Sequence, residues 1–466
     1  MHWNIFIEGV IIGRGERKLR RGKRLFILGM IILSVCFVGG CTKKGLTVLD
    51  QQGNEMEVLK KTQLGKEKID EKGYRAYLEI VLEEATQIIC KEKKVDEEEA
   101  EEILLKGNYS VYTNFDKAAY EAIKKSEVLE KDVSFGCAIT DLEGNLVAVY
   151  SGGDFKEEYQ NYAQKKTAPY SSFKPLSVYT PAMEKELITW STVYKDEPVK
   201  QIEESDGTKR DWPANATGIY SEENVSVQKA MKESLNTIAV KCLQDYGVEN
   251  SLSYMKETFG LNLKFEESRV KALGGEKVIG NVALGYLQEG VSPVEMAGYY
   301  QVFANGGKYI EPKTISKICD ANGKVIYERK EESKQIVSVE TAAIMNRLLQ
   351  RVVEPGGTGE KARCENVPVG GKTGTGDNGN WFVGFTPEYT CAVWHGKEVD
   401  KNSTTEIFSS IISEMKVDSG KKFPETDHVQ EVIYCGESGM MCGPNCRKIE
   451  KGYYSLKTEL PLCDKH

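Results

Sequence analysis

The sequence predicts a mixed α+β domain in which strands from both ends of a long segment meet in one sheet. Residues 133–139 and 146–150 are strand-like, and the turn residues 141–145 between them predict a hairpin. Helical patterns dominate residues 171–305. Strand patterns then return at residues 371–376, 381–385 and 390–394. Strands at both ends with helices between them are typical of one domain whose sheet is completed by distant segments.

Several boundaries along the chain can be placed in order. We expect a signal at 1–40, a polar tether at 41–70, a helical linker region at 71–130, the main domain at 131–415 and a cysteine-rich tail at 416–466. The charge-dense run 96–102 is typical of a solvated helix face. Ser292, Pro293 and Glu295 predict a capped helix start, and Asn305-Gly306-Gly307 predict its end. A further helix is expected near 338–353.

Length and composition exclude several classes of protein. The 466 residues allow two or three domains, and a chain that is 40% hydrophobic and 28% charged is globular rather than disordered or membrane-embedded. The net charge of −8 argues against a nucleic-acid partner, which needs basic residues to neutralise phosphates. The four histidines are His2, His395, His428 and His466. A multi-histidine metal site is therefore nearly excluded, and an enzyme of this sequence is expected to use a base other than histidine.

The N-terminus has the features of an export signal. Seven basic residues within 14–24 precede the apolar run 25–38, which is followed by Gly39, Gly40 and Cys41. This arrangement resembles a lipobox, in which the cysteine is lipidated and becomes the mature N-terminus. The alternatives are an uncleaved anchor or an ordinary buried cysteine. In each case we expect the chain to lie at the extracytoplasmic face of a cell membrane. Residues 1–40 carry seven basic and two acidic residues, so their removal changes the net charge from −8 to −13.

A serine can act as a nucleophile without histidine when a nearby lysine loses its proton and accepts the hydroxyl proton. In a helix, Ser-x-x-Lys places both side chains on one face. The pattern begins here at Ser171, Ser226, Ser253, Ser268, Ser413 and Ser419. Ser171 and Lys174 stand apart because Pro175 and a following apolar stripe predict a rigid helix start, where the helix dipole favours negative charge.

Two shorter motifs follow, and each occurs once. Ser234-Leu235-Asn236 ends an amphipathic segment; its hydroxyl and amide suit proton relay and amide binding. Lys372-Thr373-Gly374-Thr375 lies in a glycine-rich strand, where Gly374 permits close backbone approach and the hydroxyls suit a carboxylate. Alone, the first pattern is typical of a helix C-terminus and the second of an edge strand. Their order after Ser171 favours a catalytic site.

The three motifs in this order resemble those of the penicillin-binding proteins and serine β-lactamases. The flanking sequence is similar to the transpeptidase domain of class A penicillin-binding proteins from about residue 75 onward. The segments that carry the similarity are 109–116, 170–176, 234–237, 290–297, 303–307, 356–359, 371–375 and 381–387. The resemblance implies a five-stranded antiparallel sheet flanked by helices, with a helical subdomain.

The sequence departs from that family in three places. Only about 70 residues separate Cys41 from Tyr109, too few for the glycosyltransferase domain that class A proteins carry before this region. Tyr170 stands where the family usually has glycine, and the loop 376–380 is unusual. We therefore expect a transpeptidase without its polymerase domain, and a separate glycan polymerase as partner.

The resemblance also implies residue roles. Ser171 would attack a D-alanine carbonyl of a peptidoglycan stem peptide or a β-lactam, with Lys174 as base. The backbone N–H groups of Ser171 and Thr375 would form the oxyanion hole. Ser234 and Lys372 would pass a proton to the leaving group; Asn236 would hold the peptide amide; Thr373 and Thr375 would hold the terminal carboxylate. No cofactor or metal is implied. A low-turnover β-lactam sensor or scaffold, a D,D-carboxypeptidase and a β-lactamase remain alternatives to the transpeptidase.

The twelve cysteines fall into distinct groups. Cys36 lies in the signal and Cys41 is the candidate for lipidation. Six scattered cysteines are expected to be small buried residues: Cys90, Cys137, Cys242, Cys319, Cys364 and Cys391. Four others crowd into the tail: Cys435, Cys442, Cys446 and Cys463. Outside the cytoplasm such a cluster favours disulfides over a zinc site, because no C-x-x-C pair is present; their pairing cannot be read from the sequence.

Overall fold

The computed structural model describes residues 45–59, 73–127, 133–153, 159–203, 206–396 and 403–465. The expected signal and Cys41 lie outside these residues. In the part of the chain that is described, no helix is both long and apolar enough to span a membrane.

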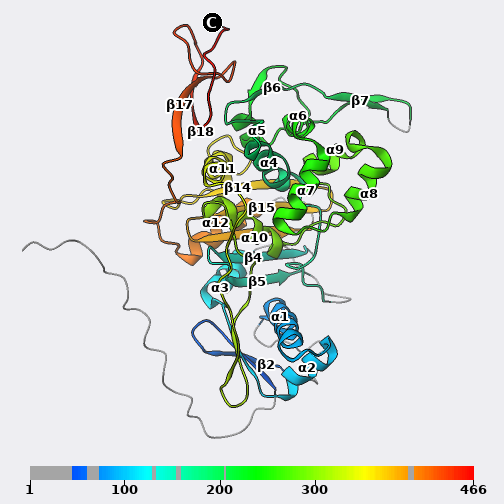
Figure 1. Cartoon of the computed structure of the whole chain (residues 1–466), viewed down its shortest axis with the longest axis vertical. Helices are drawn as coiled ribbons and strands as arrows, with labels where there is room; N and C mark the ends of the chain where they lie inside the picture. Colours follow the sequence, from blue (N-terminus) through cyan, green and yellow to red (C-terminus); the bar gives the residue numbers. More distant parts are fainter. Residues whose placement is uncertain are drawn as a thin grey trace, which may run out of the picture. The chain divides into compact units, whose positions relative to one another are not determined.

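The main sheet has five antiparallel strands in the order β14-β15-β16-β4-β5, as expected (Figure 1). Its strands are β4 (Phe135–Asp141), β5 (Leu146–Gly152), β14 (Gly370–Gly376), β15 (Gly379–Phe385) and β16 (Tyr389–His395). The predicted hairpin forms β4 and β5, and the late strand patterns form β14 to β16. Distant segments therefore close one sheet, and β14 lies at its edge.

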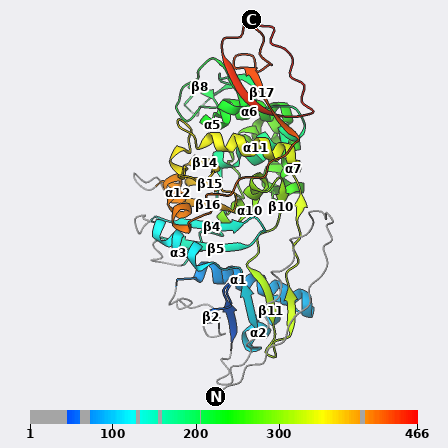
Figure 2. The same cartoon turned by 90° about the vertical axis from the view of Figure 1, so that its left-hand side faces the viewer.

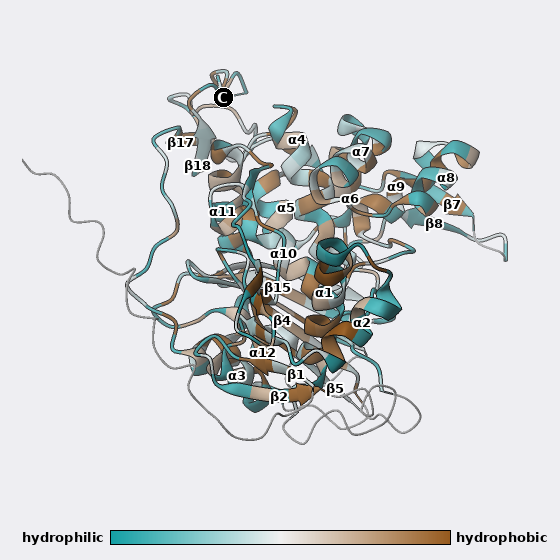
Figure 3. Cartoon of the chain, turned by 60° about the horizontal axis from the view of Figure 1, so that its bottom comes forward, coloured by the Kyte–Doolittle hydropathy of each residue, from teal (hydrophilic) through white to brown (hydrophobic). Residues whose placement is uncertain are grey.

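Helices cover both faces of this sheet. Phe382 and Phe385 are an odd number of residues apart in β15, so their side chains point to opposite faces. Phe382 packs against Phe408 of α12 (Thr404–Met415), whereas Phe385 packs against Phe303 of α10 (Pro293–Ala304). The predicted capping box of Ser292 and Glu295 begins α10. Figure 3 shows hydrophobic residues along β4, between these helical layers.

A helical subdomain is formed by residues between β5 and β14 along the chain, as the resemblance implied. It contains α4 (Thr180–Glu184), α5 (Val227–Glu233), α6 (Asn236–Tyr246), α7 (Val248–Phe259), α8 (Lys264–Leu273) and α9 (Gly275–Leu284). Two small hairpins accompany it: β6 (Val193–Lys195) with β9 (Asn224–Ser226), and β7 (Lys200–Glu203) with β8 (Lys209–Trp212). The expected late helix is α11 (Val339–Val352), which packs against both α5 and β14.

A second five-stranded sheet corrects the expected tether and linker. Its order is β12-β11-β3-β1-β2, from β1 (Leu46–Leu49), β2 (Glu55–Leu59), β3 (Ser110–Thr113), β11 (Ile315–Cys319) and β12 (Val325–Glu328). In Figure 2, β11 from the middle of the chain lies beside strands from the N-terminal side. Alternating burial explains β1, in which Leu46 and Val48 are fully buried. Residues 46–59 are therefore a hairpin and not a tether, and the sheet includes strands from within 131–415.

The expected helices of the linker region lie against this second sheet and the main one. They are α1 (Arg75–Lys93), α2 (Glu97–Lys106) and α3 (Lys117–Ser126). The Tyr77 hydroxyl of α1 donates to the Leu146 carbonyl of β5 at 2.9 Å. At the other end of the described chain, β17 (Val429–Cys435) and β18 (Ile449–Ser455) form a hairpin that packs against α11.

Candidate active site

Ser171 lies in a tightly held turn. Residues Tyr170–Phe173 form a 3₁₀ turn that continues through Lys174 into the helical turn Pro175–Tyr179. The Lys174 N–H donates to the Ser171 carbonyl, so the two side chains lie one turn apart. Ser172 Oγ donates to the Pro169 carbonyl at 2.6 Å, and the Tyr300 hydroxyl donates to the Ser172 carbonyl. The helix start predicted from the sequence is thus present, as 3₁₀ and π turns rather than α-helix, and Ser171 is partly exposed.

Lys174 connects this turn to the Ser-x-Asn motif at Ser234 and Asn236. Its buried Nζ donates to the Ser234 carbonyl at 2.9 Å and to Asn236 Oδ1 at 2.7 Å. Burial lowers the pKa of Lys174 well below its usual value, and the nearby charge of Lys372 lowers it further. A lysine with a lowered pKa can lose its proton at neutral pH and accept one from a serine hydroxyl.

Lys372 reaches the same serine from β14. Its Nζ, also buried, donates to Ser234 Oγ at 2.8 Å and to the Thr373 carbonyl at 3.2 Å. Burial lowers the pKa of Lys372 to about 7. Ser234 caps α5 in the left-handed region at φ 60°, which aims its carbonyl at one lysine and its hydroxyl at the other. The serine at this helix C-terminus therefore joins the two lysines.

The Lys-Thr-Gly motif on β14 lies against the turn that contains Ser171. A Cβ on Gly374 would lie 2.4 Å from the Pro169 carbonyl oxygen and 3.0 Å from the Ser172 nitrogen, so only glycine allows this approach. Thr373 Oγ1 donates to Thr358 Oγ1 at 2.9 Å, and Thr375 is exposed. Since β14 is the edge strand, its outer side is available to pair with an extended ligand.

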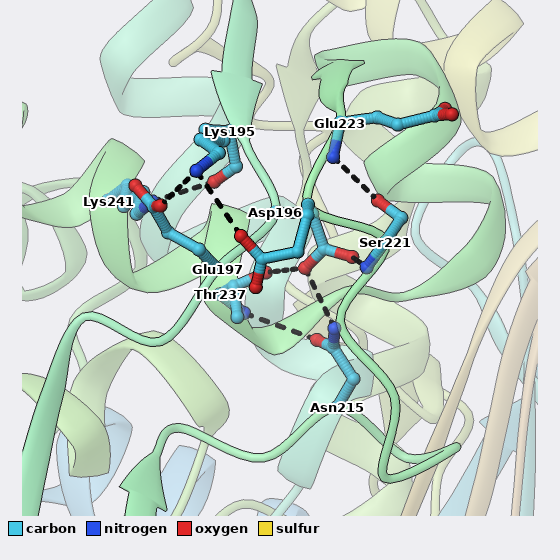
Figure 4. A network of polar contacts seen from close by, with 9 residues as sticks. Lys195, Asp196, Glu197, Asn215, Ser221, Glu223, Thr237 and Lys241 are labelled. Carbon is cyan, nitrogen blue, oxygen red and sulfur yellow. Dashed lines mark hydrogen bonds and ion pairs between the residues drawn. The ribbon is translucent and has the colours of Figure 1, made fainter.

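A buried polar network that sequence reasoning missed holds the Ser-x-Asn segment (Figure 4). Asn215 Oδ1 accepts the Asn236 N–H at 2.9 Å, and Asn215 Nδ2 donates to Asp196 Oδ1 at 2.8 Å. Thr237 Oγ1 donates to the same Asp196 oxygen at 2.6 Å, while the Ser221 N–H donates to the other at 2.9 Å. Burial alone would raise the pKa of Asp196, but the hydrogen bonds from Thr237 and Ser221 lower it.

Local sequence gives no sign of this network. Asp196 and Asn215 lie 41 and 22 residues before Thr237, in a segment without a motif. Only their position in the fold brings them to the start of α6. Because they bind the N–H of Asn236 and the side chain of Thr237 next to it, they hold Asn236 in position.

Tyr170 fills the space beside the nucleophile turn. Its φ is 50°, a left-handed conformation that glycine adopts more easily. Its ring contacts Tyr286 edge-on at 5.2 Å between centroids, and a Cβ on Gly376 would lie 2.2 Å from the Tyr170 ring. The Asn378 N–H donates to the Tyr170 hydroxyl at 3.1 Å. The two sequence departures at 170 and 376–380 are therefore in contact with one another.

The structure brings the three motifs together. Lys174 reaches Ser234 and Asn236, Lys372 reaches Ser234, and Gly374 lies on the turn that carries Ser171. Cys41 lies outside the described residues. The arrangement provides a nucleophile, two amines of lowered pKa and an open sheet edge, which are the parts that acyl transfer through a serine ester needs.

Comparisons with known proteins agree with this arrangement. The penicillin-binding protein transpeptidase domain matches residues 136–413. Penicillin-binding protein 1A of Clostridium botulinum is 31% identical over 364 residues, which cover 73% of this chain and 42% of that protein. Penicillin-binding protein 4 of Bacillus subtilis is 28% identical over 405 residues, which cover 81% of this chain and 61% of that protein. The match thus spans about two fifths of the length of the Clostridium relative.

Solved structures share the fold. Penicillin-binding protein 1A of Haemophilus influenzae superposes with a TM-score of 0.65 at 17% identity, covering 83% of this chain and 76% of that one. The D,D-transpeptidase domain of a peptidoglycan glycosyltransferase from Eggerthella lenta superposes with a TM-score of 0.61 at 19% identity, covering 79% and 97%. The family match covers more than half of the chain and includes all three motifs. The chain therefore belongs to the penicillin-binding protein transpeptidase domain family.

Proposed function

We propose that the chain is a serine D,D-transpeptidase that crosslinks peptidoglycan stem peptides and is acylated by penicillin. The observation that carries this proposal is the pair of buried lysines joined through Ser234 beside the Ser171 turn. Within the described part of the chain, both amines donate to carbonyl, hydroxyl and amide oxygens rather than to carboxylates, and burial lowers the pKa of both. Such a pair suits proton transfer rather than a structural ion pair.

The reaction follows from these positions. Neutral Lys174 accepts the hydroxyl proton as Ser171 Oγ attacks the carbonyl of the penultimate D-alanine. The N–H groups of Ser171 and Thr375 bind the oxyanion, an interaction worth about 3 kcal/mol per donor. The C–N bond then breaks; the leaving D-alanine nitrogen takes a proton from Ser234 Oγ, which Lys372 replenishes. An ester between Ser171 and the donor peptide remains.

The second half of the reaction releases the ester. An amine of a neighbouring stem peptide attacks the ester carbonyl and loses a proton to Lys372 through Ser234. The C–O bond to Ser171 breaks, Ser171 Oγ takes its proton back from Lys174, and the new amide bond is the crosslink. Water in place of the amine gives a D,D-carboxypeptidase. During both steps Asn236 holds the donor amide, Gly374 lets the donor backbone approach β14, and Thr373 and Thr375 hold the terminal carboxylate.

A β-lactam-binding sensor or scaffold of low turnover is the second candidate. Tyr170 supports it, because a buried ring replaces the usual glycine next to Ser171 and contacts the loop that follows the Lys-Thr-Gly motif. Long-lived acylation without transfer would favour this function. A β-lactamase would instead release its acyl group within seconds.

We further propose that the protein acts at the extracytoplasmic face of the membrane. A lipid on Cys41 would anchor it, and a separate polymerase would supply the glycan. The acidic charge expected after loss of residues 1–40 argues against recruitment by anionic wall polymers. Metabolic labelling with a fatty acid, compared between the wild type and Cys41→Ala, tests the anchor.

Release of D-alanine from a stem-peptide donor in the presence of an amine acceptor tests the activity. We expect crosslinked product with the full-length protein and none with Ser171→Ala. Free D-alanine without crosslinks would assign a carboxypeptidase. No release, and no acylation by penicillin, would overturn the proposal.

A further inference from the structure

Three cysteine side chains meet at the end of the C-terminal hairpin. The Sγ atoms of Cys435, Cys446 and Cys463 all lie within 4.8 Å of one another, and all three residues are buried. They form a small core of their own, against which Cys442 and Met440 pack. Cys435 ends β17, Cys442 and Cys446 lie in the loop to β18, and Cys463 lies in the segment after β18. All four carry free thiols in this structure.

The geometry suits one metal ion better than one disulfide. Zinc binds thiolates at about 2.3 Å in a tetrahedron, which places the sulfur atoms about 3.8 Å from one another. Three mutually adjacent sulfurs match three corners of such a tetrahedron. A disulfide would use two of them and leave the third buried beside the bond. Cys442, which packs on the same cluster, can supply the fourth corner.

Two hydrogen-bond donors point at the sulfurs. Ser438 Oγ donates to Cys463 Sγ at 3.3 Å, and the Gly443 N–H donates to Cys446 Sγ at 3.3 Å. Such donors stabilise the negative charge of a thiolate, the form that binds metal, and they orient the ligand. A disulfide sulfur is a weak acceptor and gains little from them.

Backbone hydrogen bonds hold the ligands from separate segments. The Cys435 N–H donates to the Met440 carbonyl at 2.7 Å, which closes the turn after β17. The Cys463 N–H donates to the Met441 carbonyl at 2.9 Å, and the Met441 N–H donates to the Pro461 carbonyl at 2.9 Å. The final segment therefore lies beside the loop that contains Cys442.

We propose that Cys435, Cys442, Cys446 and Cys463 bind one Zn²⁺ as four thiolates. The ion joins the end of β17, the loop to β18 and the final segment to one another. Other contacts dock this unit on the rest of the protein: Ser191 Oγ donates to the Gly439 carbonyl, and Tyr453 of β18 packs edge-on against Trp190. The site has a structural role, since four protein ligands leave zinc no open position for substrate. The inference is independent of the chemistry at Ser171.

The test is the zinc content of the full-length protein, purified without chelators or added metal and measured by elemental mass spectrometry. We expect one zinc per chain in the wild type and in Cys90→Ser, a matched control outside the cluster. Cys446→Ser and Cys463→Ser are expected to lose the zinc. A zinc-free wild type, or retention of zinc by both cluster variants, would overturn the proposal.

Two readouts on the wild type avoid dependence on variants that fail to fold. Replacement of zinc by Co²⁺ should give the intense sulfur-to-cobalt absorption of a tetrahedral thiolate site. Intact mass should show reduced cysteines that become alkylated only after a chelator is added. A mass lower by about 2 Da for each disulfide, with no bound metal, would assign disulfides and refute the zinc site. Penicillin acylation measured in parallel reports on Ser171 separately.

Discussion

Lys372 Nζ lies 2.8 Å from Ser234 Oγ, while the carbonyl of the same serine accepts a hydrogen bond from Lys174 Nζ at 2.9 Å. One residue therefore joins two buried amines. Their mutual repulsion, added to burial, favours a state in which one amine is neutral and the other is charged. That division matches the two tasks of the proposed reaction, in which one amine accepts a proton and the other donates one.

The lysine pair predicts a bell-shaped pH dependence of penicillin acylation. The rate should rise with pH as Lys174, whose pKa burial lowers, loses its proton and becomes able to act as a base. It should fall again as Lys372, whose pKa burial lowers to about 7, loses its proton. Neutral Lys372 can neither attract the ligand carboxylate nor supply a proton to the leaving group. The second-order rate constant, which reports on the free enzyme, measures this profile. The two limbs belong to the coupled pair rather than to single residues.

Lys372→Arg separates the two limbs. Arginine keeps its charge at all these pH values, so the falling limb should disappear even though the absolute rate drops. A wild-type rate that is constant from about pH 5 to pH 9, or a falling limb unchanged in Lys372→Arg, would contradict the assignment.

Burial of Lys372 also predicts how the free energy of unfolding depends on pH. The pKa of lysine is about 10.4 in an unfolded chain, whereas burial lowers that of Lys372 to about 7. Below the folded value both states are protonated, and the folded state carries the full cost of a buried charge. Between the two values the unfolded chain binds more protons, so stability rises with pH.

Urea unfolding at pH values across this window measures that rise. Lys372→Met should unfold at higher urea than the wild type at neutral pH and should show a smaller rise with pH. Lys361→Met is the control, because Lys361 is exposed in a surface ion pair with Glu406. Equal pH slopes for the wild type and Lys372→Met would show that burial of Lys372 has no such cost.

Asp196→Asn should slow acylation without removing a reacting group. The new amide nitrogen would face donors from Thr237, Asn215 or Ser221, and the network that holds Asn236 would be disrupted. We expect a loss of about 1–3 kcal/mol of stability and a fall of about tenfold in the acylation rate, equivalent to 1.4 kcal/mol. Asp211→Asn, at an exposed residue, should change neither. A wild-type rate in a destabilised Asp196→Asn would limit the network to a structural role.

Tyr170 and Gly376 should be strongly coupled. Gly376→Ala places a methyl group against the Tyr170 ring and should cost about 1–3 kcal/mol through overpacking. The same change in a Tyr170→Gly background should cost much less, because the ring is gone. Urea unfolding of both single variants and the double variant measures the coupling. Additive changes in the free energy of unfolding would show that the added methyl group and the Tyr170 ring do not clash.

The motifs that the sequence singled out lie together in the structure, whereas the residues that hold them in place were not predicted. Ser171, Ser234 and Lys372 belong to short local motifs that can be read directly from the sequence, and the strands of the main sheet have strong hydrophobic patterns. The hairpin at 46–59 was missed because two four- or five-residue strands within a polar segment give little periodic signal. Asp196 and Asn215 were missed because their roles depend on distant contacts, which composition and local patterning do not record.

The tail cysteines illustrate the same limit. Their spacing lacks C-x-x-C pairs, which favoured disulfides. The hairpin β17–β18 and the returning final segment bring three of the sulfurs together from separate stretches of chain. That convergence exists only in three dimensions.

Peptide mapping of the full-length protein after incubation with a fluorescent penicillin tests whether Ser171 is the nucleophile and Lys174 its base. We expect one adduct on the peptide that contains Ser171, its loss in Ser171→Ala, and much slower formation in Lys174→Met. An adduct on another residue, or an unmodified Ser171 peptide in folded wild-type protein, would contradict it.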